Sequence, residues 1–315
     1  KKVTGPWGGE NSFMGALCRY LSKKNFNITT NYQSNYDIAL INSLTMIDIN
    51  ILKNISNRKI PIIHRKTNFI ASGSNENRKK IKGIVQGDKK QIDFSKYVKH
   101  SIFQSKFSRD FFIKEGFKGK HSIITNGVDD SKFNIFRKNI LFQNVIRNFW
   151  FKNEKMKILI VSWSSNTMKG FKEYEKIDKN KRNFVDNVIS FVGNKPESML
   201  FKNIIYSKPL RHGKLKEKYL SNHVLLFLGK FETCSNTIIE AINCGLPVIY
   251  DNSGSNPEIV SDCGVSYDGN LVESVNNIKK NYNFYIKNCL KRRMKISLIG
   301  LKYEKLLIKY SSTDE

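Results

Sequence analysis

The sequence predicts an α/β fold with two domains, each built around a parallel β-sheet. Short apolar runs of strand length alternate with longer segments of helical pattern, which is typical of parallel sheets covered by helices on both faces. Nine such runs are many for one sheet, and 315 residues correspond to roughly two domains of ordinary size. With 40% hydrophobic and 12% aromatic residues the chain can bury sizeable cores, which excludes intrinsic disorder as its main description.

The strand candidates share an apolar centre, and several are bounded by Gly, Asn or Ser. They are residues 2–4, 36–42, 60–64, 101–104, 121–125, 157–162, 188–192, 223–228 and 247–250. A polar, charged stretch at 148–157 precedes a fresh strand that restarts the pattern, so we expect the domain boundary near 140–156. The N-terminal domain would then span 1–150 and the C-terminal domain 151–296. A basic helix at about 297–315 is expected to cross back to the first domain.

The chain carries a large positive charge, +27 at neutral pH, of which +18 lies in residues 1–155. Such a charge favours an anionic partner: phosphates, acidic glycans, anionic lipid head groups or nucleic acid. The alternative explanation is a genome-wide preference for Lys, Asn and Ile codons. Basic clusters at 78–82 and 291–295 are expected to form solvated faces or, alternatively, to contact anionic lipid heads.

Several features favour a cytoplasmic location. The five cysteines are odd in number and form no CxxC pair, which argues against a disulfide framework or a zinc site and favours a reducing compartment. The longest apolar runs, such as 224–228, are far shorter than the roughly 20 residues that span a bilayer. No apolar h-region precedes Gly5, so no secretory signal is expected. We therefore expect a cytoplasmic protein that could also bind the cytoplasmic face of the membrane peripherally.

The most informative stretch is 223–269, where a predicted buried strand is followed by a polar turn and a helix. The turn carries Glu232, and the helix begins near Ser235 and Asn236. Free backbone N–H groups at a helix N-terminus can bind an anion. Glu240 lies about one turn into the helix, where its carboxylate could accept hydrogen bonds from a ribose whose phosphate is bound at the helix start. Together these features predict a nucleotide-sugar pocket; the alternative is a solvated helix glutamate and an ordinary turn residue.

This stretch resembles the donor-binding signature of retaining glycosyltransferases of the GT-B fold, family 4 (glycosyl transferases group 1). The signature has two glutamates eight positions apart, here Glu232 and Glu240, followed by the run AINCGLPVI at 241–249 and the turn GSNPE at 254–258. Four more segments are similar to family elements: GPWGGENSFMGAL at 5–17, SIFQSKFSRDFF at 101–112, ITNGVDDSKF at 124–133 and MKGF at 168–171. The resemblance implies two Rossmann-like domains whose parallel sheets face an interdomain cleft.

The resemblance also implies roles for particular residues. Lys169, at the end of a strand where ligands bind in α/β domains, would neutralise the leaving diphosphate. Gly8 and Gly9 belong to a Gly-rich loop whose backbone N–H groups would approach the same diphosphate. Glu232 would orient the donor sugar hydroxyls as a catalytic residue, and Glu240 would bind the ribose. The other diphosphate contacts are expected from Ser164, Asn236, Thr237 and Ile238.

The chain departs from the family before Lys169, where members often carry an arginine and this sequence reads WSSNTMKG. Hydrogen bonds from this loop, or another cation such as Arg211 or Lys214, would have to compensate. On the other domain, strand 60–64 ends at His64, a catalytic candidate whose imidazole could donate a hydrogen bond to a sugar or acceptor. The alternative is a structural histidine. Further candidate donor or acceptor contacts are Arg65, Asn166, Ser235 and Arg211.

The resemblance implies transfer of a hexose-type sugar, with retention of the anomeric configuration, from a UDP- or GDP-sugar to a hydroxyl of a glycan, lipid-linked or other acceptor, which could be anionic. No Asp-x-Asp pair at a strand end suggests a metal-bound diphosphate, so we expect neither a metal nor another cofactor. One alternative is another enzyme of the same fold, such as a sugar-nucleotide epimerase or a phosphorylase. The other is a basic nucleic-acid-binding protein, for which the sequence offers no recognition motif.

Overall fold

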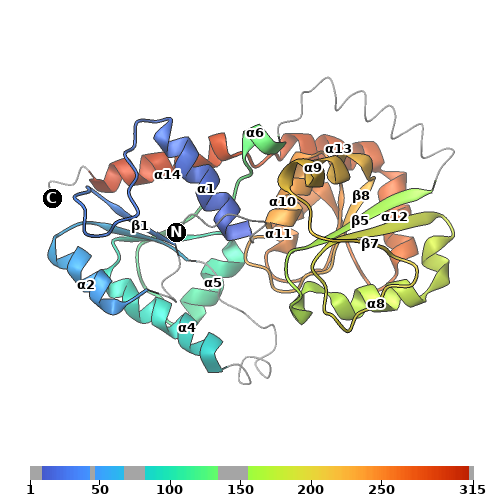
Figure 1. The fold of residues 1–315 in the computed structure, drawn as a ribbon, viewed down its shortest axis with the longest axis horizontal. Coiled ribbons are helices and arrows are strands. Elements are labelled where there is room, and N and C mark those ends of the chain that lie inside the picture. The colour runs from blue at the N-terminus through green and yellow to red at the C-terminus, as the bar shows by residue number, and fades with distance from the viewer. Residues whose placement is uncertain (1–8, 43–46, 67–81, 134–154, 312–315) are drawn as a thin grey trace. The chain divides into compact units, whose positions relative to one another are not determined.

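The protein is described by a computed structural model over residues 9–42, 47–66, 82–133 and 155–311. It divides into two compact units. Of the described residues, 16–42, 47–66, 82–126 and 296–311 belong to unit 1, and 9–15, 127–133 and 155–295 belong to unit 2. Each unit holds one all-parallel sheet with helices packed against it (Figure 1). The boundary expected near 140–156 falls almost entirely outside the described residues, as does the strand expected at 2–4.

The sheet of unit 1 has four parallel strands in sequential order. They are β1 (Ala39–Asn42), β2 (Ile62–Arg65), β3 (His100–Phe103) and β4 (His121–Ile123). The helices are α1 (Gly9–Ser22, whose first turns are counted with unit 2), α2 (Ile49–Asn57), α4 (Lys82–Asp93), α5 (Lys106–Lys114) and α14 (Ile296–Ser311). The C-terminal helix α14 packs on α1, where the Tyr20 hydroxyl donates a 2.7 Å hydrogen bond to Glu304. In Figure 1, α2 and α4 lie on the opposite side of this sheet.

The sheet of unit 2 has six parallel strands in the order β10-β9-β8-β5-β6-β7. The strands are β5 (Met156–Ser162), β6 (Asn187–Gly193), β7 (Ile205–Ser207), β8 (Val224–Phe227), β9 (Val248–Tyr250) and β10 (Gly264–Ser266). The helices are α6 (Asp130–Phe133), α8 (Phe171–Lys179), α9 (His212–Ser221), α10 (Asn236–Asn243), α11 (Asn256–Val260), α12 (Leu271–Lys280) and α13 (Tyr282–Lys291).

Alternation along β5 shows how this sheet becomes buried on both faces. Ile158 and Ile160 pack in a core with residues of α8 and α12, whereas Leu159 and Val161 pack in a second core with residues of α9 and α10. Side chains alternate between the two faces of a strand, so a strand buried on both faces needs a continuous apolar run. The run KILIVS supplies it, and this explains why the sequence predicts β5 correctly.

Eight of the nine expected strands are confirmed within the described residues, and two strands were not expected. The unexpected β7 and β10 are three-residue strands at the two edges of the six-stranded sheet. Their residues are exposed or half-buried, so they do not form the apolar run by which the inner strands are recognised.

The strand order of unit 2 creates a favourable place for a ligand. From the central β5 the chain continues to β6 and β7 on one side, and then returns to β8, β9 and β10 on the other. Ligands of open α/β sheets bind beyond the carboxyl ends of the strands at the point where this order reverses. That point lies between β5 and β8, and the loops that follow these two strands carry Lys169 and Glu232.

Among the described residues, no helix combines the length and apolar character needed to cross a bilayer.

Candidate functional site

Two side chains predicted for the donor site form an ion pair at the carboxyl edge of the unit 2 sheet. The Nζ atom of Lys169 donates to Oε1 of Glu232 across 2.5 Å. The side chains are 29% and 18% exposed, so the pair is accessible to a ligand while being shielded from bulk water. The sheet order thus joins two residues that are 63 positions apart in the sequence.

The position of Lys169 depends on the turn that follows it. The lysine ends a short 3₁₀ helix (Thr167–Lys169), which Asn166 caps by accepting a 2.9 Å hydrogen bond from the Met168 N–H. Gly170 then adopts a left-handed conformation with φ of 85°, and a Cβ atom there would lie 2.4 Å from the Leu228 carbonyl oxygen. Only glycine fits both conditions, so Gly170 lets the loop after β5 pack directly against the end of β8.

The loop that carries Glu232 is held by the turn at 254–258. The Ser255 N–H donates to the Glu232 carbonyl across 2.8 Å, and the Phe231 N–H donates to the Ser253 hydroxyl across 3.0 Å. The fully buried Asn256 side chain donates to the Gly229 carbonyl across 2.8 Å. Ser255 and Asn256 of the GSNPE turn, together with the preceding Ser253, therefore fix the backbone from Gly229 to Glu232.

Helix α10 begins beside this loop, as the sequence predicts. Ser235 is its N-cap residue, but its side chain makes no capping hydrogen bond. Thr237 and Ile238 lie in the first turn of this helix, and the N–H groups of a first turn have no acceptors within the helix. The helix start therefore offers backbone donors and the positive end of the helix dipole to an anion.

Glu240 is buried in the same helix, with only 6% of the residue exposed. The Tyr219 hydroxyl donates a 2.9 Å hydrogen bond to its Oε2 atom, and Tyr219 also hydrogen-bonds the Thr237 side chain. Burial raises the pKa of Glu240 to about 7, while the Tyr219 hydrogen bond and the charge of Lys132 oppose that shift. The carboxyl group thus changes charge within the physiological pH range.

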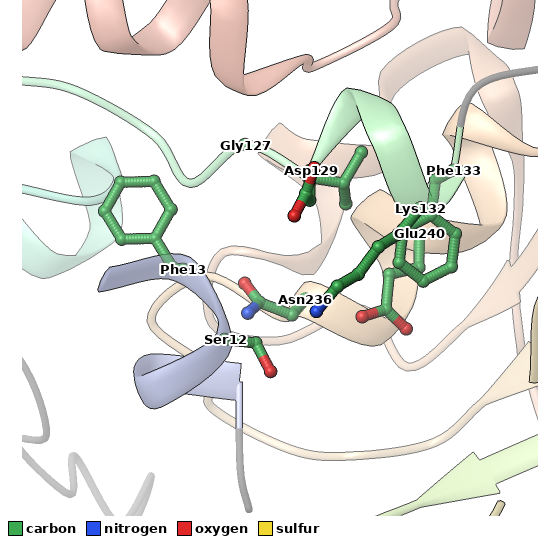
Figure 2. Close-up of a pocket in the computed structure, with 9 residues that line it drawn as sticks. Ser12, Phe13, Gly127, Asp129, Lys132, Phe133, Asn236 and Glu240 are labelled. Carbon is green, nitrogen blue, oxygen red and sulfur yellow. The ribbon is translucent and has the colours of Figure 1, made fainter. Parts of the chain in front are cut away.

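A small pocket in unit 2 exposes one side of Glu240 (Figure 2). Its lining residues come from α1, from the segment around α6, and from α10: Ser12, Phe13, Gly127, Val128, Asp129, Lys132, Phe133, Asn236 and Glu240. About 20 Å³ is open to the centre of a water molecule, which is room for about one water. A ribose would therefore enter only if side chains of the lining moved aside.

The remaining donor-side candidates lie in unit 2 with varied exposure. Ser164 is half-buried and its hydroxyl accepts from the Asn166 N–H across 3.1 Å, whereas Asn166 is exposed. Arg211, the N-cap residue of α9, is also exposed and does not line the Glu240 pocket. Gly9 is the first residue of α1, and Gly8 lies outside the described residues.

The two candidates from the first domain, His64 and Arg65, belong to unit 1 and are buried. Burial and the neighbouring cations hold the pKa of His64 well below its usual value, so the imidazole is neutral at pH 7. The Arg65 guanidinium donates to Asn42 and Asn126 side chains across 2.5 and 2.6 Å, which is a structural role within unit 1. His64 is fully buried, and its catalytic role stays a prediction.

Sequence reasoning missed two residues of the Glu240 environment, Tyr219 and Lys132. Tyr219 follows Leu215 by four positions on α9, a spacing that indicates a buried face but gives no indication of the partner. Lys132 lies inside the motif ITNGVDDSKF, and nothing in the linear sequence connects it with a glutamate on α10.

Among the described residues, no group of three or more His, Cys, Asp or Glu side chains is arranged to hold a metal ion.

Comparison with protein families identifies the C-terminal half of the chain. Residues 142–297 match the family model described as Glycosyl transferases group 1, so this stretch is a domain of that family. A comparison with curated protein sequences finds no match.

Solved structures identify the fold of the whole chain. Sucrose-phosphate synthase from Thermosynechococcus elongatus is 14% identical, with a TM-score of 0.68 over 96% of this chain and 79% of that one. The lipopolysaccharide glycosyltransferase WaaG is 10% identical, with a TM-score of 0.64 over 96% and 97% of the two chains. HepE of Anabaena, solved in complex with UDP-glucose, is 14% identical, with a TM-score of 0.62 over 86% and 78%. The expected GT-B fold is confirmed.

Proposed function

We propose that this chain, which carries a Glycosyl transferases group 1 domain, is a metal-independent, retaining glycosyltransferase. It would transfer a hexose-type sugar from a UDP- or GDP-sugar to a hydroxyl group of a glycan, lipid-linked or other acceptor. The observation that carries the proposal is the Lys169–Glu232 pair beside the uncapped start of α10, with Glu240 buried behind it. HepE was solved in complex with UDP-glucose, which supports a nucleotide-sugar donor here.

The proposed chemistry follows from the charges at this edge of the sheet. The acceptor oxygen forms a bond to the anomeric carbon as the bond from that carbon to the diphosphate oxygen breaks. The acceptor proton passes to the departing diphosphate on the same face of the sugar, so no strong protein base is required. Lys169 and the N–H groups of Asn236, Thr237 and Ile238 would stabilise the charge that develops on the diphosphate.

The acidic residues would fix the donor. Glu240 would accept hydrogen bonds from the ribose hydroxyls, and Glu232 from hydroxyls of the transferred sugar. Glu232 already accepts from Lys169, which holds its carboxylate beside the position proposed for the diphosphate. Ser164, Asn166, Ser235 and the Gly8–Gly9 loop would supply further contacts, and His64 and Arg211 remain candidates on the acceptor and donor sides.

Isothermal titration calorimetry with UDP and GDP tests the donor site. We expect the wild-type protein to bind one of them, and Lys169→Ala and Glu240→Ala each to abolish measurable binding while the protein stays folded. The exposed Lys172→Ala and Glu217→Ala are matched controls that should keep wild-type affinity. Unchanged affinity in both site variants would overturn the assignment.

Activity measurements test the reaction class. The anomeric configuration of the product, read from proton coupling constants, should equal that of the donor, and activity should survive EDTA. Inversion would exclude the retaining mechanism, and loss of activity in EDTA that Mg²⁺ or Mn²⁺ restores would exclude metal independence. Epimerised nucleotide sugar formed without acceptor would instead indicate the epimerase alternative.

We further propose that the protein is cytoplasmic and can contact an anionic membrane through α14. All five cysteines are free, which fits a reducing compartment. On α14, Leu298, Leu301 and Ile308 are 58%, 41% and 50% exposed, and the exposed Lys302 and Lys305 lie among them. Apolar side chains beside lysines favour the interface of an anionic bilayer. Co-sedimentation with vesicles of anionic phosphatidylglycerol, but not of neutral phosphatidylcholine, is expected; equal recovery with both would contradict the proposal.

A further inference from the structure

Among the described residues, the lysine proposed to bind the diphosphate is already paired with a carboxylate. Lys169 is paired with Glu232, so part of its charge is already compensated, and Glu240 adds a second carboxylate nearby. The loop before Lys169 contributes only neutral groups, among them Ser164 and Asn166. A nucleoside diphosphate is itself strongly anionic, and ionised carboxylates of Glu232 and Glu240 would repel it. A further cation would therefore strengthen the binding of the diphosphate.

The backbone around Lys132 is anchored in unit 2 by residues that precede and follow it in the sequence. Before it, the Val128 N–H donates to the Met294 carbonyl across 2.9 Å, and Val128 forms a parallel bridge with Lys295. After it, the buried Phe133 ring contacts Tyr219 with ring centroids 6.4 Å apart. The backbone that carries Lys132 is thus attached to the same unit as α10, close to the hydrogen-bond partner of Glu240.

The Lys132 side chain extends into the pocket that contains the start of α10. It lines this pocket together with Asn236 and Glu240, and Figure 2 shows it reaching from α6 toward both of them. Its residue is exposed, and its ammonium group forms no ion pair or hydrogen bond within the described residues. The charge of Lys132 nevertheless acts on Glu240, because it lowers the pKa that burial raises. Within the described part of the chain, Lys132 is thus a cation without an ion-pair partner that lines the same pocket as Asn236.

We propose that Lys132 binds a phosphate group of the nucleoside diphosphate at the N-terminus of α10, as the second cation of the donor site. This inference rests on the proposed function. An ammonium group is a compact point charge on a flexible stem, so it can move from Glu240 to a phosphate oxygen when the ligand enters. The helix N-terminus and Lys132 would then act on the same anion, with Lys169 as the other cation. Arg211 and Lys214 are exposed on α9 and do not line this pocket.

The alternative role for Lys132 is to keep Glu240 ionised, so that the lysine acts only on ribose binding. The two roles differ in their dependence on phosphate. A phosphate ligand makes the lysine important for the nucleoside diphosphate and monophosphate but not for the nucleoside. A lysine that acts through Glu240 is equally important for all three, because each contains the ribose.

The test is calorimetric titration of Lys132→Met with the diphosphate, monophosphate and nucleoside of whichever base the wild-type protein binds. Methionine keeps an unbranched side chain of similar length without the charge. We expect at least tenfold weaker binding of the two phosphorylated ligands, nucleoside binding within twofold of wild type, and partial recovery in Lys132→Arg. Lys172→Met, which removes an exposed lysine of unit 2 outside the proposed site, should leave all three affinities unchanged.

Each contrary result has a distinct meaning. If Lys132→Met loses affinity equally for the nucleoside and the diphosphate, or for neither, the assignment of Lys132 is overturned while the proposed function stays intact. Failure of the wild-type protein to bind either UDP or GDP overturns the proposed function and the inference with it. A thermal melt of each variant establishes that the compared proteins are folded.

Discussion

Lowering the pH from 8 to 6 is expected to weaken nucleoside binding about tenfold, because Glu240 loses its charge over this range. Burial raises the pKa of Glu240 to about 7. The ionised fraction is then about 0.9 at pH 8 and about 0.1 at pH 6. If the ribose hydroxyls donate to the ionised carboxylate, the apparent Kd varies inversely with that fraction. The expected change is therefore about tenfold in Kd, or about 1.4 kcal/mol.

Calorimetry with uridine or guanosine, according to the base that the protein binds, measures this effect without interference from phosphate titration. Because binding selects the ionised form, titration at pH 6 should release close to one proton per nucleoside bound. Buffers of different ionisation enthalpy make this release measurable. Glu240→Gln should bind more weakly and show no change in Kd between pH 6 and 8, whereas Glu217→Gln should behave as the wild type. A flat pH profile of the wild-type protein, or the same tenfold change in Glu240→Gln, would refute the reasoning.

Three further predictions concern stability, each measured by urea unfolding. The pKa of Glu240 in the folded protein, about 7, lies above its ordinary value of 4.5, so ionisation favours the unfolded chain. As the pH rises from 4.5 to 8, the free energy of unfolding of the wild type should fall by up to about 3 kcal/mol relative to that of Glu240→Gln. No such trend would contradict the burial of that carboxyl. Gly170→Ala should lower the free energy of unfolding by at least about 2 kcal/mol, because the new Cβ meets the Leu228 carbonyl. The control Gly269→Ala, at a position with a positive φ but open space, should lower it by about half of that. Equal decreases would show that the contact with Leu228 is unimportant. Asp178→Ala should lower the free energy of unfolding by about 2–4 kcal/mol, because the buried Asp178 carboxylate accepts three backbone N–H bonds at 2.7–2.8 Å. The control Asp268→Ala removes a single exposed hydrogen bond and should change it by no more than about 0.5 kcal/mol. An equally large decrease in the control would contradict the prediction.

The fold was predictable because its inner strands carry a local signal. An inner parallel strand is buried on both faces, and runs such as KILIVS at 157–162 show this directly in the sequence. The edge strands β7 and β10 lack such runs, because one side of an edge strand meets solvent. Their pairing depends on the neighbouring strand, which a linear pattern does not reveal.

The candidate site was predictable where its residues belong to one continuous stretch of chain. The strand, turn and helix from 223 to 245 are local elements, so the positions of Glu232 and Glu240 relative to the helix start followed from spacing. Spacing did not reveal that the side chain of the N-cap residue, Ser235, makes no capping hydrogen bond. Nor did it reveal the burial of His64, since the position of a residue at a strand end does not reveal what covers it.

By itself the sequence determined the α/β class, the places of the inner strands and the helix start between two glutamates, because periodicity, turn residues and spacing act over short distances. Only the tertiary structure brought Lys169 to Glu232, Tyr219 to Glu240 and Lys132 into the same pocket. These contacts depend on the order of strands in a sheet and on the packing of helices that are distant in the chain. The charge state of Glu240 has the same origin, since burial and neighbouring charges set its pKa.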